Sequence, residues 1–488
     1  MPATRFNVVA ITSVLGVQLG VVGALMLTAL PFSLYYGGGD HYALLGSAAI
    51  TLAIGGGLYF ARRTDIPDVS KREGYLIVVL GWLSMVACSA LPYLFSDAIP
   101  TVTDAIFETM SGMTTTGAST LTDIDEVPRG ILFWRSMTQW IGGMGIIVLT
   151  VALFPLLGIG GVELFGAEAP GPTSDKIHPR IQETAKRLYF LYVGLTLAAT
   201  AVYMVGGMGF YDAINHGLTT MATGGFSTKN ESAAFWNDAP FLQYAMIFFM
   251  AVAGTNYVVL YYLFKRDWAR AWRSDEFRAY LTLVGALTVV VTAVVWYVTP
   301  DGLELSFRES LFQIVSVITT TGFVSADYTS WAEPMTVLFF VLLFLGACAG
   351  STSGGIKVIR HLVFFKNSYL EFKRLLYPRA IVPLKLDGAV VPSKVLTHIL
   401  VFLLIFLMTF LIGSIVVTMC GMDFLSAIGA TATSLANVGP GIGDVGPVNN
   451  FAAVPMAAKW VLSFLMLLGR LELFTILILF TPYFWRDY

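Results

Sequence analysis

ITTTGFV, residues 318–324, interrupts an apolar stretch of the chain with three threonines and a glycine. Threonine is β-branched and glycine is conformationally permissive, so both disfavour the interior of a helix. Similar breaks occur at MTTTGAS (113–119), MATGGFS (221–227) and LANVGPG (435–441). The four segments align on Gly117, Gly225, Gly322 and Gly439, at a spacing of about a hundred residues. This repetition predicts four copies of one small structural unit.

The composition around these breaks is that of a membrane protein. The 488 residues are 56% hydrophobic and only 12% charged, whereas soluble proteins carry about 25% charged residues. Apolar segments long enough to cross a bilayer lie near residues 8–36, 42–61, 74–96, 131–157, 188–208, 240–264, 279–299, 334–364, 394–420 and 455–482. We therefore expect an all-α polytopic membrane protein with about ten spanning helices.

The basic residues predict how the chain is oriented in the membrane. With a cytoplasmic N-terminus and ten spans, most of the 29 Lys and Arg residues fall on the cytoplasmic side, as the positive-inside rule requires. Both termini are then cytoplasmic. Among the cations assigned to the outer side are Arg135, Arg308 and Lys459. Acidic residues outnumber basic ones on that side, and such a surface attracts cations.

Each unit carries a short segment before its glycine. An acid lies thirteen residues upstream in three cases (Asp104, Asp212 and Glu309), while the fourth unit has Ser426 there and Asp423 slightly earlier. An acid at this place is a helix-start signal. The segment between acid and glycine is too short to span a bilayer, which favours a re-entrant half-helix.

These features predict four parallel helix–pore loop–helix units arranged pseudo-symmetrically around one pore, preceded by a two-helix hairpin. The expected division is 1–70 for the hairpin, then 71–165, 166–270, 271–374 and 375–488 for the four units. Irregular backbone at membrane depth is tolerated only inside protein or beside a water-filled cavity. Rings of carbonyl oxygens can replace the hydration shell of a cation. The alternative is that the small residues only allow close helix packing, but four matching copies favour the pore.

In order and spacing, these motifs resemble the Trk/Ktr/HKT superfamily of potassium transport proteins, and most closely its bacterial Trk-type membrane subunits. The resemblance covers essentially the whole chain. It implies K⁺ uptake across the bacterial inner membrane, with K⁺ as the transported ion. The filter residues that it implies are Thr115, Thr116, Gly117, Thr223, Gly224, Gly225, Thr320, Thr321, Gly322, Asn437, Val438 and Gly439. Glycine rather than serine at 117 implies K⁺ permeation, whereas ANVGPG departs from the TTTG pattern and implies weaker selectivity.

A gate is implied by two further features. GACAGSTSGGIK (346–357) cannot hold a rigid helix, and the resemblance makes it an intramembrane loop under the filter; a close helix contact is the alternative. The expected loop residues are Gly346, Gly350, Ser351, Thr352, Ser353, Gly354 and Gly355. Arg470 lies within an expected span, where a cation is costly and functional by default. The resemblance makes it an electrostatic barrier; an ion pair with another helix is the alternative, and Glu472 points to a different helix face.

The resemblance also implies partners. It predicts a homodimer and a cytosolic, nucleotide-binding regulatory ring (TrkA-like), for which the basic stretches 265–273 and 365–374 are candidate docking surfaces. Contact of these stretches with lipid phosphates is equally expected. GGMG (142–145) falls inside an expected span and not after a strand, so we expect no nucleotide to be bound by this chain. We expect no nucleic-acid partner.

Other function classes fit less well. Coupled solute transporters commonly have inverted repeats, whereas these repeats are parallel; an H⁺- or Na⁺-coupled K⁺ symporter of the same architecture stays open. YD (211–212) and GIGD (441–444) resemble the motifs of intramembrane aspartyl proteases. Such chemistry needs two carboxylates that share a proton at membrane depth, and here both acids lie near the outer ends of segments. We therefore do not expect an enzyme.

Overall fold

A computed structural model of the chain describes residues 6–60, 70–145, 181–300 and 302–486, and these residues are mostly helical. Their only strands are the two-residue β1 (Lys385–Leu386) and β2 (Ala389–Val390), an antiparallel pair. Within these described ranges six helices are long and apolar enough to cross a membrane, or up to eight if each bent pair is one span. The expected all-α polytopic membrane fold is confirmed.

The ten apolar segments take different forms in the structure. Six are unbroken: Val8–Tyr36, His41–Phe60, Arg72–Phe95, Lys186–Val205, Asp275–Val298 and Ser393–Met419. Two are sharply bent, by 112° between Pro240–Ala253 and Tyr257–Phe264, and by 107° between Met456–Arg470 and Phe474–Phe480. Segment 334–364 is divided by the loop 346–357, and the second half of 131–157 lies outside the described residues.

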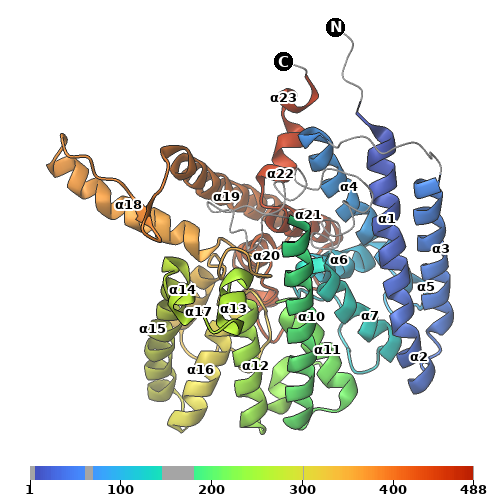
Figure 1. Ribbon diagram of the computed structural model, residues 1–488. Coiled ribbons are helices and arrows are strands. Elements are labelled where there is room, and N and C mark those ends of the chain that lie inside the picture. The colour runs from blue at the N-terminus through green and yellow to red at the C-terminus, as the bar shows by residue number, and fades with distance from the viewer. Residues whose placement is uncertain (1–5, 61–69, 146–180, 301, 487–488) are drawn as a thin grey trace.

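The chain begins with a helical hairpin. Its elements are α1 (Val8–Met26), η1 (Leu27–Ala29), α2 (Leu30–Tyr36) and α3 (His41–Phe60). Helix α1 packs against α3 and α4, and the hairpin lies at the edge of the bundle beside the first unit (Figure 1). It contributes no re-entrant loop.

The next elements form four units of the expected kind. The first holds α4 (Lys71–Ser89), α5 (Leu91–Phe95), α6 (Val102–Met113), α7 (Arg129–Trp140) and the π-helical turn η2 (Ile141–Gly145). The second holds α10 (Ile181–Val205), α11 (Phe210–Met221), η3 (Ser232–Trp236), α12 (Pro240–Ala253), α13 (Tyr257–Phe264) and α14 (Trp268–Trp272). In each, a spanning helix leads to a half-helix (α6 or α11) and a loop.

The third and fourth units repeat this plan. The third holds α15 (Asp275–Val298), α16 (Leu303–Ile318), α17 (Glu333–Leu342) and α18 (Val358–Leu376). The fourth holds α19 (Ser393–Met419), α20 (Phe424–Ala436), η4 (Gly443–Val445), α21 (Met456–Arg470), α22 (Phe474–Leu477), η5 (Ile478–Phe480) and α23 (Pro482–Trp485). Their half-helices are α16 and α20.

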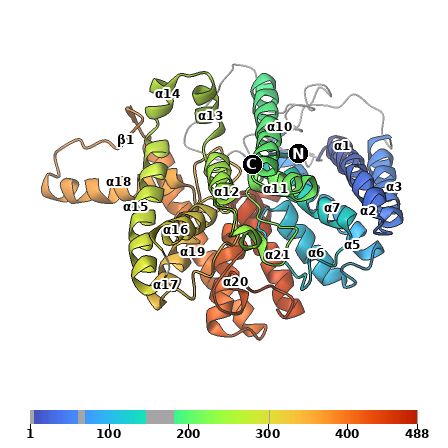
Figure 2. The ribbon, with the colours of Figure 1, turned by 90° about the horizontal axis from the view of Figure 1, so that it is seen from below.

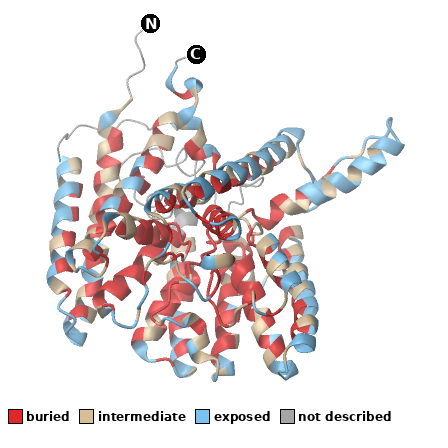
Figure 3. Cartoon of the chain, turned by 180° about the vertical axis from the view of Figure 1, so that it is seen from behind, coloured by how far each residue is buried: buried red, intermediate tan, exposed pale blue. Residues whose placement is uncertain are grey.

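The four units follow one another around a central axis (Figure 2). After three of the loops the next helix packs on the half-helix of the following unit: α7 on α11, α12 on α16 and, closing the circle, α21 on α6. The third and fourth units meet where the Tyr328 hydroxyl donates to the Gly441 carbonyl at 2.7 Å. Buried residues fill the middle of this arrangement (Figure 3). The sequence period of about a hundred residues thus corresponds to a closed ring of units.

The starts of the half-helices follow the expected acidic signals in three units, and in the second of them Asp212 lies in the first turn of α11. Thr101 caps α6 by accepting the Asp104 amide (3.2 Å), and Asp423 caps α20 by accepting the Ser426 amide (3.0 Å). The amide and hydroxyl of Ser426 hold the pKa of the Asp423 carboxyl below its usual range. The prediction that Glu309 opens the third half-helix is wrong, because α16 begins at Leu303 and has Glu304 in its first turn.

The two ends of the described chain lie together at one end of the molecule (Figure 1). The ring of Phe6 lies 6.0 Å from that of Phe484 and 5.7 Å from that of Trp485, centroid to centroid. Arg72 donates to the carbonyl oxygen of Arg486 at 2.8 Å. Helix α18 projects sideways from the bundle, and its far end is exposed (Figures 1 and 3).

Candidate cation filter and intramembrane loop

All four half-helices end in the same hydrogen-bonded turn, a Schellman motif. In each segment, the amide of the residue before the aligned glycine (Gly117, Gly225, Gly322 or Gly439) donates to the carbonyl five residues earlier, in the half-helix. The pairs are Thr116 to Ser111 (2.8 Å), Gly224 to Thr219 (2.9 Å), Thr321 to Ser316 (2.8 Å) and Val438 to Thr433 (3.1 Å). Each half-helix is therefore stopped at the same point, and the next residues run on as an irregular loop. We name these loops 1 to 4 in chain order, as the segments 113–119, 221–227, 318–324 and 435–441.

The turn requires a left-handed residue, and that residue is unusual here. It is Thr115, Thr223, Thr320 or Asn437, with φ of 54°, 53°, 55° and 55°. Glycine commonly fills this place, whereas a β-branched residue at positive φ is a true outlier that costs about 1–3 kcal/mol. Strain of this kind clusters at functional sites, and it recurs here in three loops.

Two residues later each loop has a glycine at positive φ, and these four glycines form a ring. A Cβ built on each would fall within 3.0 Å of a carbonyl oxygen in another loop, closer than real Cβ atoms come. The contacts run from Gly117 to Gly224, from Gly225 to Thr321, from Gly322 to Val438 and from Gly439 to Thr116. The structure thus brings all twelve sequence-predicted filter residues together, with main chain packed directly on main chain.

The ring departs from fourfold symmetry in its hydroxyl groups. In loops 1 and 3 the hydroxyl of Thr116 lies 2.7 Å from that of Thr114, and the hydroxyl of Thr321 lies 2.7 Å from that of Thr319. Loops 2 and 4 have no hydroxyl at either of these positions, since they read ATGG and ANVG there. The sequence indicated a departure in loop 4; loop 2 departs as well.

Buried polar side chains tie the outgoing chain back to the half-helices. Nine residues before the ring glycine stands Glu108, His216 or Gln313. Glu108 accepts from the Thr120 amide (2.7 Å), His216 Nε2 lies 3.0 Å from the Ser227 hydroxyl, and Gln313 donates to the Ala326 carbonyl (2.9 Å). These contacts hold the chain where it leaves each of three loops, and sequence reasoning missed them.

Arg135 connects half-helix α6, which leads into loop 1, with loop 2. Its Nε lies 2.7 Å from Glu108 Oε1, with side chains 2% and 0% exposed, and its Nη1 donates to the Ser227 carbonyl at 3.1 Å. The guanidinium also lies 3.4 Å from the ring centroid of Phe226. Arg135 is buried in α7 and does not face the solvent. Its place in the apolar segment 131–157 was the available signal.

Two other cations that the charge count assigned to the outer side are buried as well. Arg308 is buried against Glu304 (3.0 Å) and the Asn237 carbonyl (2.8 Å). Lys459 is 4% exposed and pairs with Asp104 at 2.6 Å. Both neutralise first-turn acids of half-helices instead of facing solvent.

The loop 346–357 lies against the C-terminal ends of two half-helices. The Gly354 amide donates to the Thr320 hydroxyl (2.6 Å), and the Thr352 hydroxyl donates to the Met221 carbonyl (3.0 Å). The Ser351 hydroxyl lies 2.8 Å from that of Ser353. Gly350 and Gly355 have positive φ, and Gly346 pairs with Ile356 at 2.9 Å. The sequence-predicted loop residues therefore contact the candidate filter directly from the side of the half-helix ends.

The two ends of the intramembrane loop share one anchor, which sequence reasoning also missed. Glu276, buried in the first turn of α15, accepts from the amides of Ala349 (2.7 Å) and Ile359 (3.1 Å). Buried Lys357 donates to the Ser353 hydroxyl at 2.9 Å. The loop is thus closed at its base by one carboxylate.

Arg470 is the last residue of α21, so the helix ends at the cation instead of continuing past it. Its guanidinium donates to the carbonyls of Thr352 (2.9 Å), Gly142 (2.5 Å) and Gly143 (2.8 Å). GGMG therefore belongs to a π-helical turn that receives Arg470. Glu472 pairs with Arg360 of α18, in keeping with its expected separation from Arg470.

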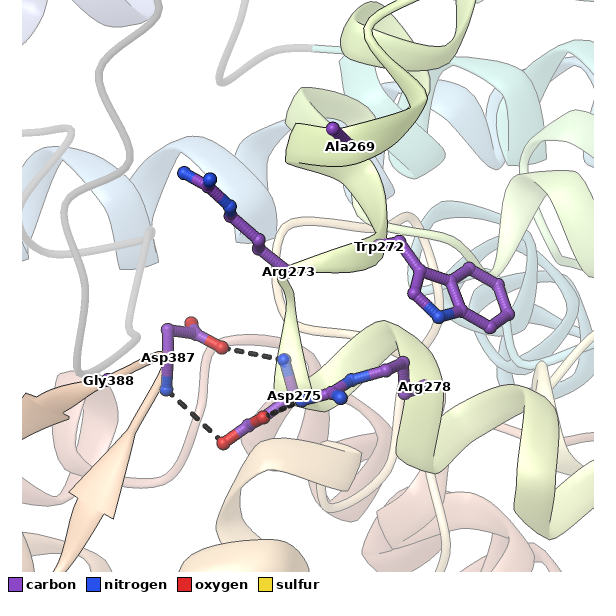
Figure 4. Close-up of a pocket in the computed structure, with 7 residues that line it drawn as sticks. All are labelled: Ala269, Trp272, Arg273, Asp275, Arg278, Asp387 and Gly388. Carbon is purple, nitrogen blue, oxygen red and sulfur yellow. Dashed lines mark hydrogen bonds and ion pairs between the residues drawn. The ribbon is translucent and has the colours of Figure 1, made fainter.

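A surface pocket of about 510 Å³ lies elsewhere, between α14, α15 and the β1–β2 turn (Figure 4). It is lined by Ala269, Trp272, Arg273, Asp275, Arg278, Asp387 and Gly388. Asp275 and Asp387 each accept from the other's amide, at 2.6 and 3.2 Å. No filter or intramembrane-loop residue lines it. Among the described residues no group of three His, Cys, Asp or Glu side chains could hold a metal ion.

Comparisons with known proteins show the family and the fold. The family model TrkH, described as a cation transport protein, matches residues 41–486. The Trk system potassium uptake proteins TrkH of Salmonella typhimurium and Escherichia coli K12 are each 40% identical over 98% of this chain and 99% of their own. A crystal structure of the potassium transporter TrkH from Vibrio parahaemolyticus superposes with a TM-score of 0.88 and 36% identity, over 99% of this chain and 100% of that one.

Proposed function

This chain belongs to the TrkH family of cation transport proteins, and from this premise we propose that it is a potassium uptake protein that conducts K⁺ through the ring of four loops. The curated relatives are named for potassium uptake. The observation that carries the proposal is the closed circle of loop-to-loop contacts from Gly117 through Gly225 and Gly322 to Gly439.

The oxygen atoms of the four loops would bind the ion. The proposed ligand residues are Thr115, Thr116, Gly117, Thr223, Gly224, Gly225, Thr320, Thr321, Gly322, Asn437, Val438 and Gly439. Carbonyl rings can replace the hydration shell of K⁺, and the negative ends of four half-helix dipoles favour a cation at the same place. The hydroxyl oxygens of Thr115 and the side-chain oxygen of Asn437, both buried without a hydrogen-bond partner, support this assignment.

We further propose that the loop 346–357 and Arg470 gate this path. The contact from Gly354 to Thr320 links the loop to the filter, and the bond from Arg470 to Thr352 holds the loop in place. Deletion of residues 350–354 is expected to give a leakier pore. A pore that stays tight in folded protein would remove the gate assignment.

The remaining parts of the proposal concern assembly and placement. We propose a homodimer in the bacterial inner membrane, with both termini cytoplasmic. We propose that a cytosolic TrkA-like ring binds the basic segments 265–273 and 365–374. We also propose that the chain divides into 1–70, 71–165, 166–270, 271–374 and 375–488. The packing of Phe6 on Phe484 supports termini on one side. The exposed apolar residues of α18 support a partner there: Phe365, Tyr369, Phe372, Leu375 and Leu376.

Flux measurements on purified protein in liposomes test the function. We expect K⁺ and Rb⁺ to pass and chloride to be excluded; no cation flux, or equal chloride flux, would overturn the proposal. Reversal potentials in K⁺ and Na⁺ gradients give the selectivity. A proton or Na⁺ gradient imposed separately tests the coupled symporter, which predicts K⁺ accumulation driven by that gradient. The protease alternative is answered, because the family is one of transporters and not of enzymes.

A further inference from the structure

Loop 2 is built differently from loops 1 and 3 where it enters the ring. In loops 1 and 3 a pair of threonine hydroxyls braces the residue before the glycine, Thr116 or Thr321. Loop 2 has Ala222 and Gly224 at these two positions. Because neither has a hydroxyl, this brace is missing, and an unbraced loop would hold its carbonyl less firmly.

The side chain of Gln139 fills the space that the missing threonine leaves. A Cβ added to Gly224 would meet Gln139 first, and the three nearest atoms are Cδ, Oε1 and Nε2 of that side chain. Gln139 is 0% exposed and lies one turn after Arg135 on the same face of α7. The absence of a side chain at Gly224 and the presence of glutamine at 139 are therefore two parts of one arrangement.

The Gln139 amide pairs with both main-chain groups that flank the ring glycine of loop 2. Its Nε2 donates to the Gly224 carbonyl at 2.5 Å, and its Oε1 accepts from the Phe226 amide at 3.1 Å. Gly225 lies between these two partners. A two-point contact of this kind fixes the orientation of the peptide groups and not only their distance from α7.

The carbonyl that Gln139 holds belongs to the ring itself. It is the oxygen that lies against Gly117, and the equivalent oxygens in the other loops are those of Thr116, Thr321 and Val438. A hydrogen bond to this oxygen restrains its direction and takes up part of its capacity to accept. One of the four proposed ligand carbonyls is thereby made unlike the rest.

We propose that Gln139 is a positioning residue that sets the ion preference of the filter by fixing the Gly224 carbonyl. This inference rests on the proposed K⁺ function and adds to it a residue outside the four loops. Without the amide, the Gly224 peptide can turn, and a ring with one mobile oxygen adapts more readily to an ion of another radius. Selectivity should fall while conduction persists.

The test compares Gln139→Leu with a matched control, Gln243→Leu, in liposomes with K⁺ and Na⁺ gradients. Gln243 is also a fully buried glutamine, on α12, and it donates to the Ala233 carbonyl (3.3 Å) and to the Asn237 side chain, both outside the four loops. Loss of a hydrogen bond of ordinary strength predicts about a fivefold fall in the K⁺ to Na⁺ permeability ratio for Gln139→Leu. The control should keep the wild-type ratio.

A rescue variant separates positioning from a general packing role. Gln139→Ala combined with Ala222→Thr and Gly224→Thr gives loop 2 the pair of hydroxyls that braces loops 1 and 3, in the volume that the glutamine leaves. It should recover part of the selectivity that Gln139→Ala alone loses. If Gln139→Leu does not yield folded protein, Gln139→Glu replaces it, since a carboxylate keeps the size but cannot donate to Gly224.

The outcomes distinguish this inference from the function on which it rests. A wild-type protein that passes no K⁺ overturns the proposed function. A K⁺-selective wild type whose Gln139→Leu and Gln139→Glu variants keep the same permeability ratio overturns the role of Gln139 alone. Loss of selectivity in the Gln243→Leu control to the same degree would also overturn it, because any buried glutamine would then have this effect.

Discussion

The guanidinium of Arg470 donates to the main-chain carbonyl of Thr352 at 2.9 Å, so the cation that ends α21 holds the intramembrane loop directly. Two further bonds to Gly142 and Gly143 attach the same side chain to the first unit. Arg470 is thus a cross-link between three units of the ring. Arg470 thus supplies both a positive charge and hydrogen bonds that hold the loop, and substitutions can separate these two effects.

Replacing Arg470 with alanine should raise K⁺ flux, because both the charge and the three hydrogen bonds disappear. Lysine keeps the charge but is a point donor without the planar fork of arginine. If charge alone limits conduction, Arg470→Lys will match wild type; if the tie to the loop matters, it will conduct more than wild type and less than Arg470→Ala. Rb⁺ uptake into liposomes measures the order, and unchanged or lower flux in folded Arg470→Ala protein would contradict the prediction.

Alanine at a ring glycine should abolish conduction. At Gly225 a Cβ would collide with the Thr321 carbonyl, and φ of 75° is unfavourable for alanine. We expect at least a tenfold loss of flux, equivalent to about 1.4 kcal/mol, with reduced thermal stability. Gly285→Ala is the control, since that glycine lies within helix α15 with nothing within 4 Å. There alanine should stabilise the protein by about 0.5–1 kcal/mol and leave flux unchanged.

The four loops could be predicted from sequence because their requirements are local. Each copy needs a turn that ends a helix and a glycine that approaches the main chain of another loop. These needs are met by the same few residue types at each copy, as at Thr320 and Gly322. The intramembrane loop left a similar run of glycine and serine. Bends within the spans could not be predicted in this way, because hydropathy indicates the length of an apolar segment and not the direction of its helices. The bends at Gly254–Asn256 and after Arg470 were therefore taken as continuous spans.

Contacts between distant parts of the chain were the part that sequence did not reveal. Gln139 meets Gly224 across 85 residues, and Glu276 meets Ala349 across 73. The sequence around Gln139 or Glu276 does not indicate which distant residue each one contacts. The charge count assigned Arg135 only to a side of the membrane, whereas its burial depends on Glu108, which lies on another helix.

Loosening the base of the intramembrane loop should also increase flux. Glu276→Ala leaves the amides of Ala349 and Ile359 without their shared acceptor, at a cost of about 1–3 kcal/mol for each donor that stays buried. The glutamine variant retains an acceptor oxygen and should lie between alanine and wild type. Glu371→Ala on the projecting helix α18 is the control, because that carboxylate is exposed and pairs with its neighbour Arg374 on the same helix. Equal flux in wild type, Glu276→Ala and Glu276→Gln would show that the anchor does not restrain the loop.

The buried pair of Arg135 and Glu108 should be costly to break and cheaper to remove as a whole. Arg135→Met leaves a carboxylate that is 0% exposed without its cation, and breaking such a pair costs about 3–5 kcal/mol. Glu108→Gln strands the guanidinium instead, although its contact with the ring of Phe226 and its bond to Ser227 persist. The double variant buries no isolated charge, so it should unfold at a higher temperature than Arg135→Met. A double-mutant cycle of thermal unfolding in detergent measures this coupling. Additive losses would mean that the two side chains act independently, and the ion pair would then have no part in holding loops 1 and 2 together.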